Sequence, residues 1–214
     1  MDTDTPGTTA PTTLTPATTG TDRAPLRLAV ILGSNREGRF GPVVAEWFLS
    51  RAAGREDFAV SYVDLGETPP PAALTATPSP TEAARLAAVT PELDAADAFV
   101  VITPEYNHSF PAVLKSLVDW HYGEWQAKPV AFVSYGGMSG GLRAVEQLRQ
   151  VFAEMHAVTV RDTVSFHHAG ALFDDAGNHR DPAGPDAAAK AMLDQLAWWA
   201  VALRDAKAVR PYTG

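Results

Sequence analysis

The chain contains no cysteine among its 214 residues. Disulfide bonds, thiolate metal sites and thiol nucleophiles are therefore excluded, so any redox chemistry has to come from a bound cofactor. Long apolar runs are missing too: no stretch approaches the roughly 20 residues that cross a bilayer, and we expect no membrane contact. Basic residues number 17 against 25 acidic ones, giving a net charge of −8. Without a basic stripe to neutralise a phosphate backbone, nucleic acid is not an expected partner.

Bulky apolar residues are scarce at the N-terminus, where residues 1–24 are mostly Thr, Pro and Ala, with Leu14 as the exception. Such a segment cannot offset the entropy cost of ordering, which predicts a disordered tail. Its acidic start lacks the basic residues and the apolar stretch of a secretory signal, so we expect a cytoplasmic protein. With 46% hydrophobic residues overall, the chain can bury one good core. We therefore expect one domain over residues 25–214.

From residue 26 onward, short apolar runs alternate with segments of helical periodicity. This alternation predicts an α/β fold, a doubly wound sheet of five parallel strands with helices on both faces. Residues 163–184 are polar and rich in His, Asp and Gly, and no regular structure is predicted there. The expected strands are 26–32, 58–65, 98–103, 130–134 and 157–160, and the expected helices are 42–49, 81–93, 111–120, 141–155 and 186–207.

The loop after the first strand, residues 33–41, combines glycines with polar side chains. Ser34 and Asn35 offer short donors, and Arg36 and Arg39 offer guanidinium groups that can hold a phosphate through two hydrogen bonds. Since helix N-termini also attract anions, the loop is interpreted as a phosphate cradle. The alternative is an ordinary turn with solvated arginines, but the position after the first strand favours the cradle. Neither a dinucleotide fingerprint nor a P-loop is present.

The loop after the third strand contains Pro104, Glu105, Tyr106 and Asn107. Proline stiffens the turn, exposed amides could face the polar edge of a ring, and the tyrosine offers an apolar plate. The alternative reading is that Asn107 or Ser109 only caps the next helix. Because ligands of open parallel sheets bind at the carboxyl ends of the strands, we favour a binding role.

The loop after the fourth strand, residues 134–141, is rich in glycine. It begins with Ser134, Tyr135, Gly136 and Gly137, and glycine at such a place allows the backbone to approach a ligand closely. Taken alone, the loop could equally be a flexible connector. Together with the other two loops, it suits one nucleotide site in which an anion is held beside a flat polar ring, as a flavin nucleotide requires.

These motifs resemble those of the NADPH-dependent FMN reductases, a family of flavodoxin-like fold that includes flavin, quinone, azo-dye and chromate reductases. The resemblance covers roughly residues 26–155 and depends most on the Pro-Glu-Tyr-Asn motif at 104–107. It implies that Ser34, Arg36 and Arg39 hold the FMN phosphate, with Phe40 and Gly41 nearby. It likewise implies that residues 104–107 and 135–137 flank the isoalloxazine ring.

The resemblance also implies a function. Bound FMN would be reduced by NADPH or NADH as co-substrate and then reoxidised by a small acceptor, which could be a quinone, an azo compound, free flavin or a metal oxyanion. No catalytic side chain is predicted, because the flavin carries the chemistry. Homodimers or homotetramers are expected. The alternative is a flavodoxin-like electron carrier, or FMN-binding module, without a nicotinamide site.

Histidines in the 163–184 segment are the remaining candidates for chemistry. His167, His168 and His179 stand at no recognised ligand spacing, and neighbouring acidic residues lack the alternation of a calcium loop. No metal site is predicted.

Overall fold

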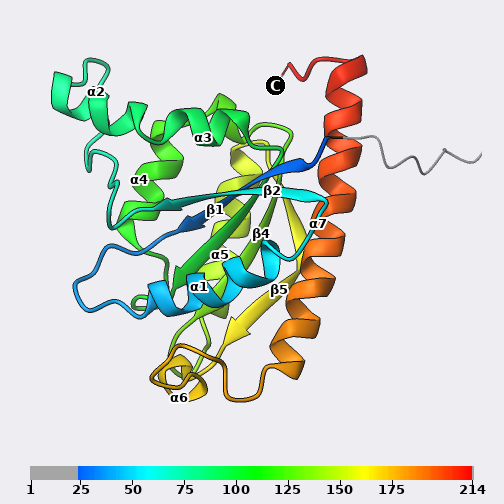
Figure 1. Ribbon diagram of the computed structural model, residues 1–214. Helices are drawn as coiled ribbons and strands as arrows, with labels where there is room; N and C mark the ends of the chain where they lie inside the picture. Colours follow the sequence, from blue (N-terminus) through cyan, green and yellow to red (C-terminus); the bar gives the residue numbers. More distant parts are fainter. Residues whose placement is uncertain (1–23, 214) are drawn as a thin grey trace, which may run out of the picture.

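The computed structural model describes residues 24–213, and these form a five-stranded parallel sheet in the order β2-β1-β3-β4-β5. This is the doubly wound order of the flavodoxin-like fold, so the predicted fold class is confirmed. Figure 1 shows the strands fanning across the molecule between two sets of helices. The strands are β1 (Leu26–Leu32), β2 (Phe58–Asp64), β3 (Ala98–Pro104), β4 (Pro129–Tyr135) and β5 (Val158–Phe166).

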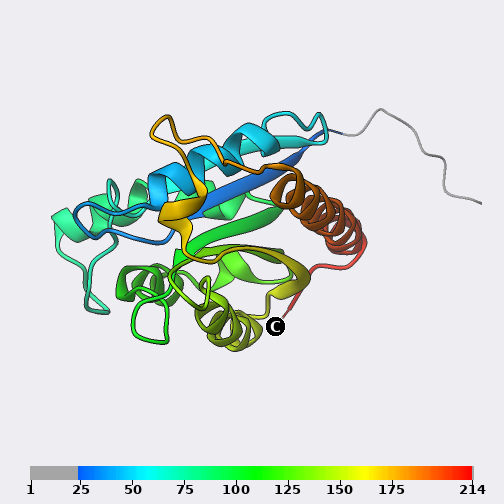
Figure 2. The same ribbon diagram turned by 90° about the horizontal axis from the view of Figure 1, so that it is seen from below.

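Helices cover both faces of the sheet (Figure 2). One core cluster joins the sheet to α1 and α7, and a second cluster joins the opposite face to α3, α4 and α5. The fold is thus a three-layer arrangement with the sheet in the middle. The helices are α1 (Gly41–Ala52), α2 (Pro80–Ala87), α3 (Thr90–Ala95), α4 (Ala112–Trp120), α5 (Leu142–Glu154), α6 (Ala169–Leu172) and α7 (Ala183–Val209), with a short 3-10 turn η1 (Gly123–Trp125).

The apolar runs form central strands because both faces of the sheet are covered. In β1, Val30 and Leu32 point into the α1/α7 core, whereas Ala29 and Ile31 point into the opposite one. All seven residues of β3 are buried. A run without polar alternation is therefore what a central parallel strand needs.

The helix expected over residues 81–93 is wrong as a single element. The structure has two helices there, α2 and α3, which are separated at Ala88 and Val89. Pro91 explains the break, since a proline fits in the first turn of a helix but not in its interior. The sequence carried this signal.

The fifth strand is longer than expected and extends into the segment for which no regular structure was predicted. Its pairing with β4 shifts register between Val130 and Phe132, and the strand then continues until Phe166 lies opposite Tyr135. An irregularity of this kind lets a strand resume pairing after extra residues. The helix α6 follows, and at the bottom of Figure 1 it lies beside the carboxyl end of β5.

The last helix also begins earlier and ends later than expected, at Ala183 and Val209. The prediction of a disordered tail falls almost entirely on residues 1–23, outside the described residues. Within the part that the structure describes, no helix has the length and apolar character to span a bilayer.

Candidate functional site

The three loops singled out in the sequence meet at the carboxyl ends of β1, β3 and β4. They enclose a hollow of about 320 Å³. This is the edge of the sheet where ligands of doubly wound folds bind. The lining residues are Arg36, Phe40, Pro104, Glu105, Tyr106, Tyr135, Gly136, Gly137, Ala169 and Gly170.

Arg36 is the cation of this hollow. It is exposed, and its guanidinium carbon lies 5.6 Å from the ring centroid of Tyr106. Among the described residues no carboxylate pairs with it. A guanidinium group without an acidic partner beside an aromatic plate is free to bind an anionic ligand.

Arg39, predicted to hold the phosphate beside Arg36, is not among the residues that line the hollow. Its guanidinium binds the carboxylate of Asp64 through both oxygens, with Nη2 donating at 2.8 Å, and Nη1 also donates to the Ser34 carbonyl at 2.6 Å. The side-chain hydrogen bond to Asp64 raises the pKa of Arg39. The ion pair holds this cation on Asp64, outside the lining of the hollow.

Ser34 lies behind the hollow rather than in its wall. The residue is fully buried, and its hydroxyl shares a hydrogen bond of 3.2 Å with the phenol oxygen of Tyr135. Gly41 is required at the same point, because a Cβ there would lie 2.6 Å from that phenol oxygen. Burial raises the pKa of Tyr135 to about 12, and the hydrogen bond with Ser34 offsets part of this rise. The phenol is therefore neutral at ordinary pH and ties the first loop to the third.

The second loop is a tight two-residue turn. Tyr106 and Ser109 exchange both backbone hydrogen bonds, at 2.8 and 3.0 Å, and the intervening Asn107 and His108 have φ values of 50° and 75°. Positive φ at both central residues defines a type I′ turn, and non-glycine residues adopt it at a conformational cost. The N-cap of α4 is Pro111, so the alternative in which Asn107 or Ser109 caps this helix is wrong.

Glu105 reaches from the second loop to the third. Its side chain is only 6% exposed, pairs with Arg143 at 2.6 Å and accepts the Arg143 backbone N–H at 3.2 Å. Burial alone would raise the pKa of Glu105, but hydrogen bonds from Ser139 and Arg143 together with the Arg143 charge lower it below its ordinary value. An ionised carboxylate at the start of α5 satisfies a free helix N–H and complements the helix dipole.

The third loop presents fewer free amides than the sequence suggested. The Gly136 N–H donates to Phe166 O, because β5 extends alongside. Ser134 is buried and donates its hydroxyl to Gly140 O, so it fixes the loop from behind. Gly137 is different: a Cβ built there meets no protein atom within 4 Å. Its backbone N–H has no partner among the described residues, which leaves it available at the hollow.

Two predicted residues, Asn35 and Asn107, are exposed and do not line the hollow. Conversely, Ala169 and Gly170 close one side of the hollow, although no motif in the sequence pointed to them. They arrive there because Ala169 N–H and His168 N–H donate to the carbonyls of Gly136 and Gly137. These are backbone contacts that any residue type can make, so no side-chain signal marks them.

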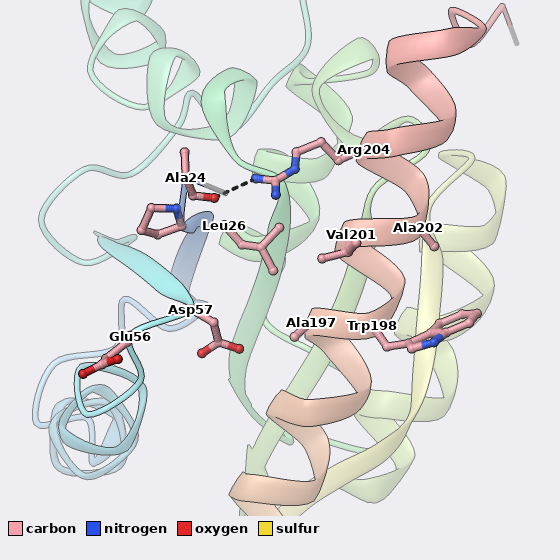
Figure 3. Close-up of a pocket in the computed structure, with 10 residues that line it drawn as sticks. Ala24, Leu26, Glu56, Asp57, Ala197, Trp198, Val201, Ala202 and Arg204 are labelled. Atoms are coloured by element: carbon pink, nitrogen blue, oxygen red, sulfur yellow. Dashed lines mark hydrogen bonds between the residues drawn. The ribbon is translucent and has the colours of Figure 1, made fainter. Parts of the chain in front are cut away.

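A second hollow of about 460 Å³ lies at the opposite, amino-terminal edge of β1 and β2 (Figure 3). It is lined by apolar side chains of α7, including the 65% exposed Trp198, together with Leu26 and the acidic Asp57. Its position opposite the carboxyl ends of the strands does not suit the nucleotide of a doubly wound fold.

The described residues contain no group of three His, Asp or Glu side chains arranged to hold a metal ion. His167 instead bonds the Met138 carbonyl through Nδ1 at 2.9 Å. His179 accepts the Asp181 N–H at 3.1 Å and packs against Phe166 and Phe173.

The chain matches the family described as NADPH-dependent FMN reductase over residues 26–171. It is 31% identical to a quinone reductase of Pseudomonas putida over 80% of this chain and 93% of that protein. It is 32% identical to a 2-hydroxy-1,4-benzoquinone reductase of a Burkholderia species, over 72% of this chain and 85% of that one. These matches confirm the resemblance drawn from the loop motifs.

A further relative is an NAD(P)H-dependent FMN reductase of Schizosaccharomyces pombe, 34% identical over 58% of this chain. The match spans 64% of that relative's length. Among solved structures, the flavoenzyme NAD(P)H:acceptor oxidoreductase FerB of Paracoccus denitrificans superposes with a TM-score of 0.65 over 83% of this chain and 98% of its own, at 20% identity. At this identity the likeness concerns the fold.

Proposed function

Since the chain belongs to the NADPH-dependent FMN reductase family, we propose that it is an oxidoreductase that binds FMN between the three loops and reduces it with NADPH or NADH. The observation that carries this proposal is that Arg36, which pairs with no carboxylate of the described residues, and Gly137, an open glycine, meet in one hollow at the carboxyl edge of the sheet. The first suits a phosphate and the second suits a ring that lies against the backbone.

The lining residues fit FMN in kind. Arg36 would hold the phosphate, while Phe40 and Tyr106 supply apolar surface for the flavin. The Gly137 N–H, which has no partner among the described residues, can donate a hydrogen bond to a ring nitrogen or carbonyl oxygen of the flavin. When bound, FMN supplies the redox chemistry, taking a hydride equivalent from reduced nicotinamide and passing two electrons to an acceptor.

The ionisable side chains of the hollow position ligands rather than transfer protons. Glu105 is ionised and engaged with Arg143, and the phenol of Tyr135 stays protonated because its pKa is about 12. Neither is a suitable proton donor near neutral pH. This supports a reaction in which the protein binds, orients and shields the cofactor.

We propose a quinone as the acceptor class, because two relatives with high coverage are named quinone reductases. A small flat acceptor can also stack on the exposed face of the bound flavin, where nicotinamide has to bind first. Alternate use of one face predicts ping-pong kinetics.

We further propose that the chain forms a homodimer or homotetramer through surface next to the site. The support is apolar exposure there: Met138 and Leu142, in and after the third loop, are 84% and 44% exposed. Clustered exposed apolar side chains mark association surfaces. Light scattering after size exclusion should give a molar mass of two or four times 22.8 kDa. Leu142→Glu should lower this molar mass toward that of one chain.

The function is tested by FMN titration followed by steady-state turnover. FMN fluorescence should be quenched on addition of the protein, and NADPH oxidation with 1,4-benzoquinone should give parallel double-reciprocal lines. Bound FMN without NADPH oxidation would support the electron carrier instead. A protein that leaves FMN fluorescence unchanged would contradict both functions.

A further inference from the structure

The loop after β1 and the end of β2 are joined by an ion pair that the proposed chemistry does not use. Arg39 in the loop binds both carboxylate oxygens of Asp64, the last residue of β2. The two side chains are only 14% and 13% exposed. A bidentate pair in such surroundings is geometrically specific and is screened less than a surface pair.

Both partners are held by further contacts. The Asp64 carboxylate accepts the Gly66 N–H at 2.8 Å, and the Arg39 guanidinium lies directly over Gly66, where any Cβ would overlap it. Glu67 adds a distant contact at 3.9 Å. The local backbone is therefore shaped around the guanidinium group.

The same guanidinium fixes Ser34. Arg39 Nη1 donates to the Ser34 carbonyl at 2.6 Å, while the Ser34 hydroxyl bonds Tyr135 on the other side. Ser34 is thus held at its backbone and at its side chain, two residues before Arg36. Arg36 itself remains exposed in the hollow and unpaired among the described carboxylates.

We propose that Arg39 is a positioning residue rather than a phosphate ligand: with Asp64 it clasps the first loop in the conformation that presents Arg36 to an anionic cofactor. This inference rests on the proposed FMN function. Its physical basis is preorganisation, since a loop that is already ordered loses less entropy when the ligand binds. The pair is electrically neutral, so the charge offered to the phosphate comes from Arg36.

The competing account has Arg39 turning to the phosphate when FMN binds. That movement would leave the partly buried Asp64 carboxylate without its cation and the Ser34 carbonyl without its donor, and an unpaired buried charge is strongly destabilising. Salt weakens FMN binding by screening the phosphate from the arginine that contacts it. If Arg39 only positions the loop, removing it should leave this salt dependence unchanged; if Arg39 contacts the phosphate, removing it should reduce the salt dependence.

The test uses a charge-neutral double variant, Arg39→Met with Asp64→Asn, so that the net local charge is unchanged. FMN dissociation constants are measured from low to high NaCl for this variant, for wild type and for Arg36→Met. Removal of a distant pair, Arg55→Met with Asp57→Asn, is the matched control, because that pair is also bidentate, at 2.8 and 2.6 Å, but lies at the amino-terminal edge of β2.

If Arg39 positions the loop, the double variant should bind FMN roughly tenfold more weakly, a loss of affinity that is common when a supporting residue is removed. Its FMN affinity should depend on salt as strongly as that of wild type. In FMN-free protein, tryptic cleavage after Arg36 should also become faster. Arg36→Met should flatten the salt dependence, and the control should match wild type in both assays.

A flattened salt dependence in the double variant, like that of Arg36→Met, would overturn the inference and make Arg39 a phosphate ligand. Unchanged FMN affinity, or unchanged cleavage after Arg36, would also overturn it. A wild-type protein that binds no FMN would instead refute the proposed function, which distinguishes the two failures.

Discussion

The guanidinium group of Arg36 lies over the ring of Tyr106, 5.6 Å from its centroid, although the two residues come from loops after different strands. This contact orients a cation at the mouth of the hollow at the carboxyl edge of the sheet. It also places the proposed phosphate contact next to the proposed ring contact.

The first prediction concerns this cation. Arg36→Ala should leave the fold intact and weaken FMN binding by about 1.5 to 3 kcal/mol, the scale of a charge-assisted hydrogen bond. Riboflavin lacks the phosphate and should bind wild type and variant equally, which makes it the internal control. Isothermal titration with both ligands gives the comparison. Equal FMN affinities in the two proteins would remove Arg36 from the site.

The second prediction uses Gly137, whose φ lies outside the left-handed region and whose missing Cβ would meet no protein atom within 4 Å. Gly137→Val is therefore compatible with the FMN-free fold but should clash with a ring that approaches the backbone. We expect FMN binding weakened by about 1 kcal/mol or more. Gly184→Val, at a glycine with equally open space in α7, is the matched control for folding.

Thermal midpoints and FMN dissociation constants of the two glycine variants show whether the third loop is a wall of the cofactor site or a solvent-exposed connector. If the Gly137 variant keeps wild-type FMN affinity, the loop is a solvent-exposed connector and not a wall of the cofactor site.

The third prediction is a pH dependence of stability far from the site. Lys128, 7% exposed, donates to the carbonyls of Leu93 and Asp94 at the end of α3. Burial, aided by the charge of Lys207, lowers the pKa of Lys128 to about 8 from its ordinary value of 10.5. Between these values the unfolded chain binds more protons than the folded one, so this lysine makes the free energy of unfolding rise with pH.

Urea unfolding of wild type and Lys128→Met between pH 7 and pH 10 measures this effect. The free energy of unfolding of wild type relative to the variant should increase above pH 8. A difference that stays constant across the range would show that Lys128 keeps an ordinary pKa.

The fourth prediction concerns the boundary of the folded domain. Because residues 1–23 are dominated by Thr, Pro and Ala, a chain that begins at Ala24 should keep the thermal midpoint and the NADPH oxidation rate of the full chain. The shortened chain retains the Ala24 carbonyl, which accepts a hydrogen bond from Arg204. A clear fall in either quantity would show that the tail contacts the folded part or a second copy.

Most of the sheet could be predicted from the sequence because its central strands are buried on both faces. The run 98–103 needed no alternation to be identified as a strand, and β3 is buried throughout. The fifth strand was harder, since it lies at the edge of the sheet and its pairing with β4 shifts register. A polar, interrupted edge strand carries a weak apolar signal.

The candidate site could be predicted only as loops at strand ends. Chain position indicated that Arg36, Tyr106 and Gly137 would meet, and the structure brings them together. Sequence could not reveal that Arg39 turns to Asp64, 25 residues away, because this depends on β1 and β2 being neighbours. The contribution of α6 was also hidden, since it is made by backbone groups.

The most direct test of the proposed function is rapid anaerobic mixing of the FMN-loaded protein with NADPH, followed by absorbance at the flavin band. NADPH should remove this absorbance promptly, at a rate that saturates with NADPH concentration, and 1,4-benzoquinone should restore it fully. A protein that holds FMN but keeps its oxidised spectrum in the presence of both NADPH and NADH would show that it is not an NAD(P)H-dependent reductase.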